Sequence, residues 1–199
     1  MPNSVTLPNQ ATSPHRVCPW WIGYLLASPL RKIFQNPKDL LAGHVLPGMT
    51  VLEPGPGMGF FTLELARRVG DSGRVIAVDI QPRMLKGLRR RAARAGLLDR
   101  VETRQAMPDS LCIDDLKAAV DFTLAVAVVH ELPSAASFFR EVAYTSKPGA
   151  RVLLVEPKGH VPDRQFDEEL WAARDAGFSA PQSQPSRGSH TVLLQRVGT

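Results

Sequence analysis

The sequence predicts an α/β protein with a doubly wound, mainly parallel sheet, helices on both faces and an N-terminal helical cap. Two observations carry this prediction. Apolar, β-branched runs typical of strands buried on both faces alternate with segments of helical periodicity. A glycine-rich turn also joins the first such run to the helix after it. The chain has 199 residues, which suits one such domain, expected over residues 47–199.

The segment before this domain divides into a tail and a cap. Residues 1–16 are polar and rich in proline, which predicts a flexible tail. Residues 17–46 hold the apolar helical cap, and Trp20, Trp21 and Tyr24 are its candidate substrate-pocket residues. The same segment also fits a helix that simply packs on the domain. A third interpretation is a weak contact with a membrane surface, because basic residues follow the two tryptophans.

The end of the cap carries a helix start. Asn36 is expected as the N-cap and Pro37 as the first helical residue. The helix should run to about Ala42, with Gly43 as its end.

The first strand of the domain runs into the glycine-rich turn, in the stretch VLEPGPGMGFFT (51–62). Glu53 stands where the strand should finish, and Gly55, Gly57 and Gly59 follow at every second position. Glycine accepts positive φ and lets a ligand approach the backbone, and the turn presents amide groups at a helix N-terminus. A tight turn without a ligand needs fewer glycines, so the pattern predicts a ligand site.

The spacing and the acid favour a cationic ligand over a dinucleotide. A dinucleotide turn reads G-x-G-x-x-G, but here the third glycine comes one position early and Phe60 stands where Gly or Ala is needed. A phosphate beside Glu53 would meet like charge, whereas an amine would be attracted. The E-x-G-x-G-x-G turn resembles the first motif of class I S-adenosylmethionine-dependent methyltransferases. The resemblance implies S-adenosylmethionine as cofactor, with the glycines and Pro56 around its methionine half and Glu53 near its amine.

The second strand supplies the next cofactor candidates. RVIAVDI (74–80) ends in Asp79, about 20 residues past the turn, where a carboxylate can accept hydrogen bonds from both ribose hydroxyls. Ile80 would lie against the adenine, and a simple loop aspartate is the other interpretation of Asp79. The helix expected over 81–98 has a basic outer face. We expect that face to be solvated, because no aromatic residues are interleaved to stack bases.

The third and fourth strands complete the predicted cofactor pocket. Gln105 and Ala106 follow the third strand, 101–104, where the resembled family often carries an acid that accepts from the adenine amine. The Gln105 amide can still read that edge through its donor and acceptor. The fourth strand lies within 120–129. Its carboxyl end, near Ala125 to Ala127, should border the ligand, and Ala125 is the candidate contact.

His130 and Glu131 come directly after the fourth strand and are the catalytic candidates. Either can serve as a general base, because histidine titrates near neutral pH and a carboxylate can be tuned towards it. The alternatives are a surface loop pair without chemical function and a histidine that orients a neighbouring loop. The implied reaction is an in-line displacement at the methyl carbon, which mainly needs alignment and exclusion of water, so no catalytic triad is expected.

The rest of the chain continues the alternation of helices and strands. We expect a helix, a Lys-Pro-Gly turn, a strand, a helix and a closing strand over residues 135–146, 147–149, 151–156, 166–176 and 190–196. The family resemblance implies seven strands in the order 3-2-1-4-5-7-6, with strand 7 antiparallel.

Composition narrows the partners. The net charge of +5 permits an anionic partner without requiring one. Cys18 and Cys112 form neither a disulfide framework nor a metal site, and with no secretory signal they suggest the cytoplasm. No apolar run reaches the roughly 20 residues that span a bilayer.

These patterns predict methyl transfer from S-adenosylmethionine to a small-molecule acceptor, with nucleic acid not expected as a partner. RNA or protein methylation and cofactor binding without catalysis are the alternatives, and a nicotinamide-dependent oxidoreductase is a more distant one. An arsenic methyltransferase would need more cysteines than the two present. The acceptor itself and the oligomeric state are left open.

Overall fold

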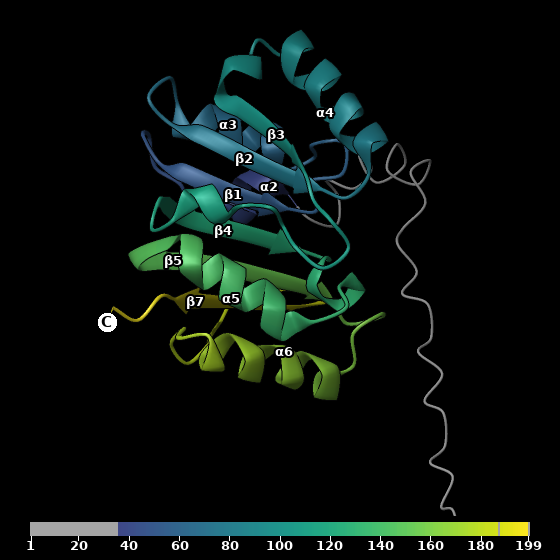
Figure 1. Cartoon of the computed structure of the whole chain (residues 1–199), viewed down its shortest axis with the longest axis vertical. Helices are drawn as coiled ribbons and strands as arrows, with labels where there is room; N and C mark the ends of the chain where they lie inside the picture. The colour runs from purple at the N-terminus through teal and green to yellow at the C-terminus, as the bar shows by residue number, and fades with distance from the viewer. Residues whose placement is uncertain (1–35, 187, 199) are drawn as a thin grey trace, which may run out of the picture.

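One sheet organises the part of the chain that the structure, a computed structural model, describes: residues 36–186 and 188–198. Its seven strands are hydrogen-bonded in the order β3-β2-β1-β4-β5-β7-β6 (Figure 1). Strands β1 to β5 are parallel, and β7 is antiparallel to β5. The predicted strand order and the reversed last strand are therefore confirmed. The strands are β1 (Thr50–Pro54), β2 (Arg74–Asp79), β3 (Val101–Gln105), β4 (Val120–Val126), β5 (Ser146–Pro157), β6 (Gln182–Ser183) and β7 (Ser189–Gln195).

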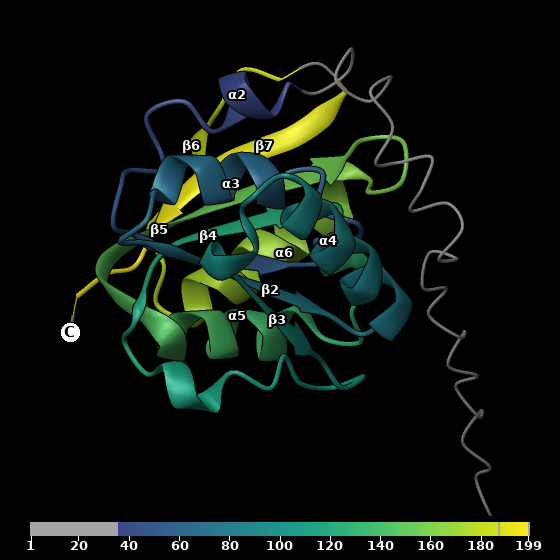
Figure 2. The same ribbon diagram turned by 90° about the horizontal axis from the view of Figure 1, so that it is seen from above.

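Helices cover both faces of this sheet, as expected for a doubly wound fold. Buried residues of α3 and α4 pack on one face, together with Leu40 and Leu41 at the end of α2, and those of α5 and α6 pack on the other. Figure 2 shows α3 and α5 on opposite sides of the strands. The helices are α2 (Pro37–Leu40), α3 (Thr62–Val69), α4 (Pro82–Arg94), α5 (Ala135–Thr145) and α6 (Asp163–Asp175). None of the helices in the described ranges has the length and apolar character needed to cross a membrane.

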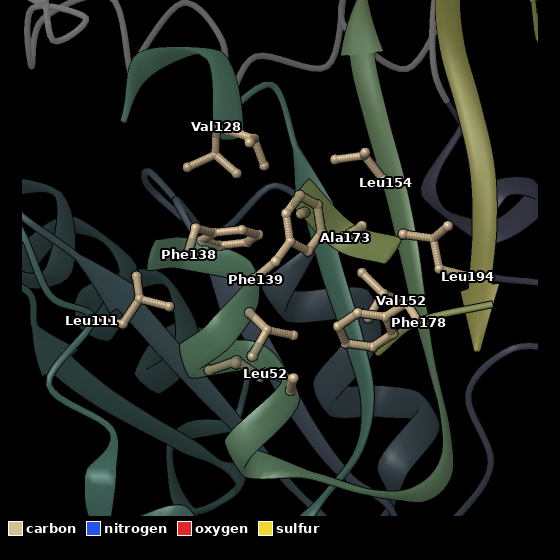
Figure 3. Packing of buried hydrophobic residues seen from close by; sticks show 14 of the residues in the cluster. Leu52, Leu111, Val128, Phe138, Phe139, Val152, Leu154, Ala173, Phe178 and Leu194 are labelled. Carbon is tan, nitrogen blue, oxygen red and sulfur yellow. The ribbon is translucent and has the colours of Figure 1, made fainter. Parts of the chain in front are cut away.

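The sheet separates two hydrophobic clusters. One, between the sheet and α3 and α4, contains Leu65 and Leu88. The other lies between the sheet and α5 and α6, and Phe138 and Phe139 project into it from α5 (Figure 3). This second cluster extends to Val128, beyond the end of β4, so the core reaches the edge where the parallel strands end.

Most of the predicted cap lies outside the described residues. This applies to Trp20, Trp21, Tyr24 and Cys18, and to the tail over residues 1–16.

The described end of the cap confirms the predicted helix start. The Asn36 side chain accepts a hydrogen bond from the Lys38 amide, and Pro37 is the first helical residue. The helix is slightly shorter than expected. It ends at Leu40 with Leu41 as its C-cap, whereas the prediction extended it to about Ala42.

Several element boundaries differ from the sequence prediction. Strand β5 begins at Ser146, so the expected Lys-Pro-Gly turn lies inside the strand as an irregularity in its pairing with β4. Helix α4 stops at Arg94, ahead of Gly96, which has φ 66°. Strand β4 stops at Val126, because Ala127 takes a φ of 53° and turns the chain. The sequence did not locate β6, a two-residue edge strand.

Candidate functional site

A cavity of about 770 Å³ opens at the carboxyl edge of β1, β2 and β4. This volume is typical of a small-molecule site, at roughly 300–1,000 Å³. The segments that follow the strands form its walls, together with the first turns of α5. The lining comprises residues 54–58, 78–81, 106–111, 126–128 and 130–134, with Phe60, Met84, Ser137, Phe138, Glu141, Pro157 and His160.

The three glycines of the turn after β1 have two different tasks. Gly55 and Gly57 line the cavity, and a Cβ built on Gly57 would meet no atom within 4 Å, so its backbone is open to a ligand. Gly59 does not line the cavity. A Cβ there would come within 2.3 Å of Leu88 Cδ1, so this glycine allows α4 to pack closely on the turn. Gly59 therefore has a packing role, and its predicted ligand contact stays a prediction.

Asp79 lies at the end of β2, on the cavity wall, and joins the turn to the second strand. Its Oδ2 accepts a hydrogen bond from the Gly57 amide at 3.3 Å, and its Oδ1 accepts one from the Gln81 amide at 2.8 Å. Burial raises the pKa of Asp79 to about 6, and the two amides partly oppose that rise. At neutral pH the group is an ionised acceptor with lone pairs left for ligand hydroxyls.

Glu53 is almost fully buried, with 3% of its surface exposed, at the end of β1. Burial raises its pKa to about 8, the Thr62 hydroxyl partly offsets this, and the charge of Asp79 adds to it. Its Oε2 has no hydrogen-bond partner among the described residues. A small void of about 30 Å³, which shares Gly55 and Pro56 with the main cavity, adjoins this side chain. A buried carboxyl group with an open acceptor favours a cationic partner, because the cation stabilises the ionised form of the group.

The remaining predicted cofactor residues divide into those at the cavity and those away from it. Pro56, Ile80 and Ala106 line it. Gln105 is exposed and is absent from the lining. Ala125 is fully buried in the core and does not line the cavity, whose wall is formed here by its neighbours Val126 and Ala127.

Both catalytic candidates line the cavity, and one has a partner that sequence reasoning missed. His130 Nδ1 lies 2.6 Å from Glu156 Oε2, and Glu156, near the end of β5, is completely buried. This hydrogen bond raises the pKa of His130 above its usual value, although burial of the ring opposes the rise. Glu131 also faces the cavity. The only signal for Glu156 was the acid-proline pair that ends the fifth strand.

A second missed carboxylate holds the loop after β3. Glu141 of α5 accepts hydrogen bonds from Ser110 Oγ and from the Leu111 amide, at 3.1 and 2.9 Å. Leu111 and Glu141 both line the cavity. This contact could not be predicted from the sequence, because a glutamate within an amphipathic helix is usually solvated.

Comparison with known proteins decides the family. The family model for a methyltransferase domain matches residues 51–149, from β1 through the Asp79 strand to the beginning of β5. The crystal structure of a S-adenosylmethionine-dependent methyltransferase from Aquifex aeolicus has the same fold, with a TM-score of 0.79, 24% identity and coverage of 91% of this chain and 100% of that one. The chain belongs to the class I S-adenosylmethionine-dependent methyltransferases.

Curated methyltransferases of known activity share part of this sequence. An arsenite methyltransferase of Halobacterium salinarum is 31% identical over 147 residues, which cover 72% of this chain and 36% of that protein. A ubiquinone/menaquinone biosynthesis C-methyltransferase of Enterobacter sp. is 33% identical over 110 residues, covering 55% and 43%. This methyltransferase chain therefore spans less than half the length of these relatives.

The residues present fit the cofactor of the methyltransferases. The open Oε2 of Glu53 suits the cofactor's amino group, and the remaining lone pairs of Asp79 suit its ribose hydroxyls. Gly57 has no side chain, so its backbone is open to contact with the cofactor. When bound, S-adenosylmethionine supplies an electrophilic methyl group on sulfur.

Proposed function

We propose that this chain transfers the methyl group of S-adenosylmethionine to a small-molecule acceptor bound in the same cavity. The observation that carries the proposal is the single cavity of about 770 Å³, which is lined both by the cofactor residues after β1 and β2 and by the catalytic candidates after β4. Both reactants can therefore meet in one cavity. Alignment of this kind is the main contribution that an enzyme makes to a direct displacement.

The rest of the cavity lining favours an acceptor of small size and largely apolar character. Met107, Leu132 and Phe138 supply apolar surface there, and His130 and Glu141 supply polar groups. The two curated relatives support a small acceptor, since their names refer to arsenite and to ubiquinone or menaquinone biosynthesis. Of these, arsenite fits less well, because the chain has two cysteines and Cys112 is not part of the cavity wall.

Calorimetric titration with S-adenosylhomocysteine tests cofactor binding. We expect Asp79→Ala to lower the affinity by about 1.5–3 kcal/mol, or roughly 10- to 150-fold, because a charged acceptor of the ribose is lost. Asp109→Ala is the matched control, since Asp109 also lines the cavity but is exposed on a different loop. Equal affinity in the Asp79 variant and the wild type would contradict the ribose assignment.

A labelled methyl donor tests the acceptor class. The full chain is incubated with methyl-labelled cofactor and a cell extract, which is then separated into small-molecule, RNA and protein fractions. We expect the label among small molecules. Label confined to RNA or protein would reject the proposed acceptor class, and binding of NADH in place of S-adenosylhomocysteine would reject the methyltransferase proposal.

A further inference from the structure

Two buried glutamates lie near His130, and the proposed function does not yet assign them a role. Glu156 of β5 is 0% exposed and Glu169 of α6 is 4% exposed. Buried carboxylates are costly unless they are paired. A fold that keeps two of them beside a cavity-lining histidine points to a role in proton chemistry.

The hydrogen bonds of Glu156 use both of its oxygens. Oε1 accepts from the Val128 and Val129 amides, at 3.3 and 2.8 Å. Oε2 meets His130 Nδ1 at 2.6 Å. The two amides can only donate, so they fix the carboxylate from behind, and Oε2 remains as an acceptor directed at the histidine ring.

This arrangement sets the tautomer of His130. A carboxylate that accepts at Nδ1 requires the proton to be on Nδ1, which leaves Nε2 of the neutral ring as the basic nitrogen. His130 lines the cavity, so Nε2 is the nitrogen available to a bound acceptor. A histidine held in this way is oriented for general-base catalysis, by the logic of the histidine–acid pair in serine hydrolases.

The protonation state of Glu169 limits the negative charge around His130. Its two oxygens have no hydrogen-bond partner among the described residues. Burial, and next the charge of Glu156, raise the pKa of Glu169 to about 8, while a charged His130 would lower it. At neutral pH Glu169 therefore keeps its proton, and the group in hydrogen-bond contact with His130 is Glu156. Glu131 also faces His130, and the His160 ring lies 6.3 Å from the His130 ring.

We propose that Glu156 is a positioning residue that presents Nε2 of His130 as a base, and that the acceptor is therefore a molecule whose methylated atom carries a proton, such as a phenol, an enol or an acidic C–H group. This inference rests on the proposed methyltransferase function. The acceptor atom forms a bond to the methyl carbon while the C–S bond breaks and its electron pair returns to sulfur. The proton of the acceptor passes to Nε2 of His130, and the Glu156 carboxylate stabilises the resulting imidazolium. Acceptors without such a proton need no base.

Nitrogen-15 NMR of the full chain tests the tautomer without any acceptor. The chain has five histidines, and His130→Gln identifies the signal of His130. Above the pKa of His130 we expect the Nδ1–H tautomer in the wild type. Glu156→Gln should lose it, because one amide oxygen cannot serve both the backbone amides and the ring. Glu169→Gln should keep the tautomer, since glutamine resembles the protonated acid, and Glu131→Gln should keep it as well. An Nε2–H tautomer in the wild type would overturn the inference.

An acceptor panel gives the second readout. The panel pairs phenols, catechols and 1,3-dicarbonyl compounds with tertiary amines, thioethers and arsenite, whose methylated atoms carry no proton, and release of S-adenosylhomocysteine is measured. We expect turnover of the proton-bearing set, with a loss of about 100-fold or more in His130→Gln and at least tenfold in Glu156→Gln. Turnover confined to the second set, unaffected by His130→Gln, would overturn the inference and leave the proposed function intact. Failure to bind S-adenosylhomocysteine would instead reject the proposed function, and the NMR result would still decide the tautomer.

Discussion

Glu53 is a single residue whose charge state couples folding to ligand binding. Its pKa is about 8 in the folded chain, against about 4.5 in an ordinary setting. The folded state therefore keeps a proton that the unfolded chain releases, and stability without ligand falls as the pH rises from about 4.5 to about 8. A ligand that brings an ammonium group to the open Oε2 relieves this cost.

Glu53→Gln tests this coupling. We expect the variant to fold normally. Without cofactor, its melting temperature should equal that of the wild type near pH 5 and exceed it near pH 8, because glutamine carries no ionisation cost. Each 1 kcal/mol of stability corresponds to about 2–4 °C in melting temperature. Its affinity for S-adenosylhomocysteine should fall by about 1.5–3 kcal/mol at pH 8, since an amide replaces the carboxylate. Melting curves at the two pH values and calorimetry check both statements. A large loss of thermal stability at both pH values would instead assign Glu53 a structural role.

At the scale of elements, the turn after β1 has one glycine that faces open space and one that packs against a helix, within three residues. Gly57 faces open space with φ 54°, whereas Gly59 has φ 82° and lies against Leu88 of α4. Leu88 is fully buried, so it cannot yield easily to a new methyl group. The two glycines should therefore respond differently to the same substitution.

Gly59→Ala should destabilise the fold by about 1–3 kcal/mol or more, because overpacking adds to an unfavourable backbone conformation. Gly57→Ala should weaken cofactor binding more than it lowers the melting temperature. Gly96→Ala is a control for the backbone term alone, since Gly96 has φ 66° and no atom within 4 Å of its Cβ position. Thermal melts and calorimetry on the three variants separate the effects. Equal losses of stability in Gly59→Ala and Gly96→Ala would contradict the packing role.

The sequence predicted the strands well because their apolar runs report burial on both faces. Positions just beyond strand ends were harder, since they depend on where the backbone turns. Ala125 was expected at the ligand, but the strand continues one residue further and the turn comes at Ala127, so Ala125 stays in the core. Glu169 could not be predicted, because a glutamate in an amphipathic helix is usually solvated until tertiary packing buries it.

At the scale of the whole molecule, the predicted cap remains a prediction. If residues 18–41 cover the methyl end of the cofactor, the apolar cluster around Trp20 would exclude water from the reaction. We expect amides from Trp20 to Leu26 to gain protection from hydrogen exchange when S-adenosylhomocysteine binds. Protection that changes only around Gly55 to Gly59 would show that the segment is ordinary packing.

The cavity wall has a consequence for how this protein can change over evolution. Leu111, Val128 and Phe138 line the cavity and also belong to the hydrophobic cluster under α5 and α6. Any substitution that reshapes the acceptor side therefore also alters the packing of that half of the protein. Exchanges that conserve volume are tolerated best in such positions, and truncations cost about 2–5 kcal/mol each. New acceptor preferences should therefore arise by small, volume-matched steps, or only after stabilising substitutions elsewhere have made larger ones tolerable.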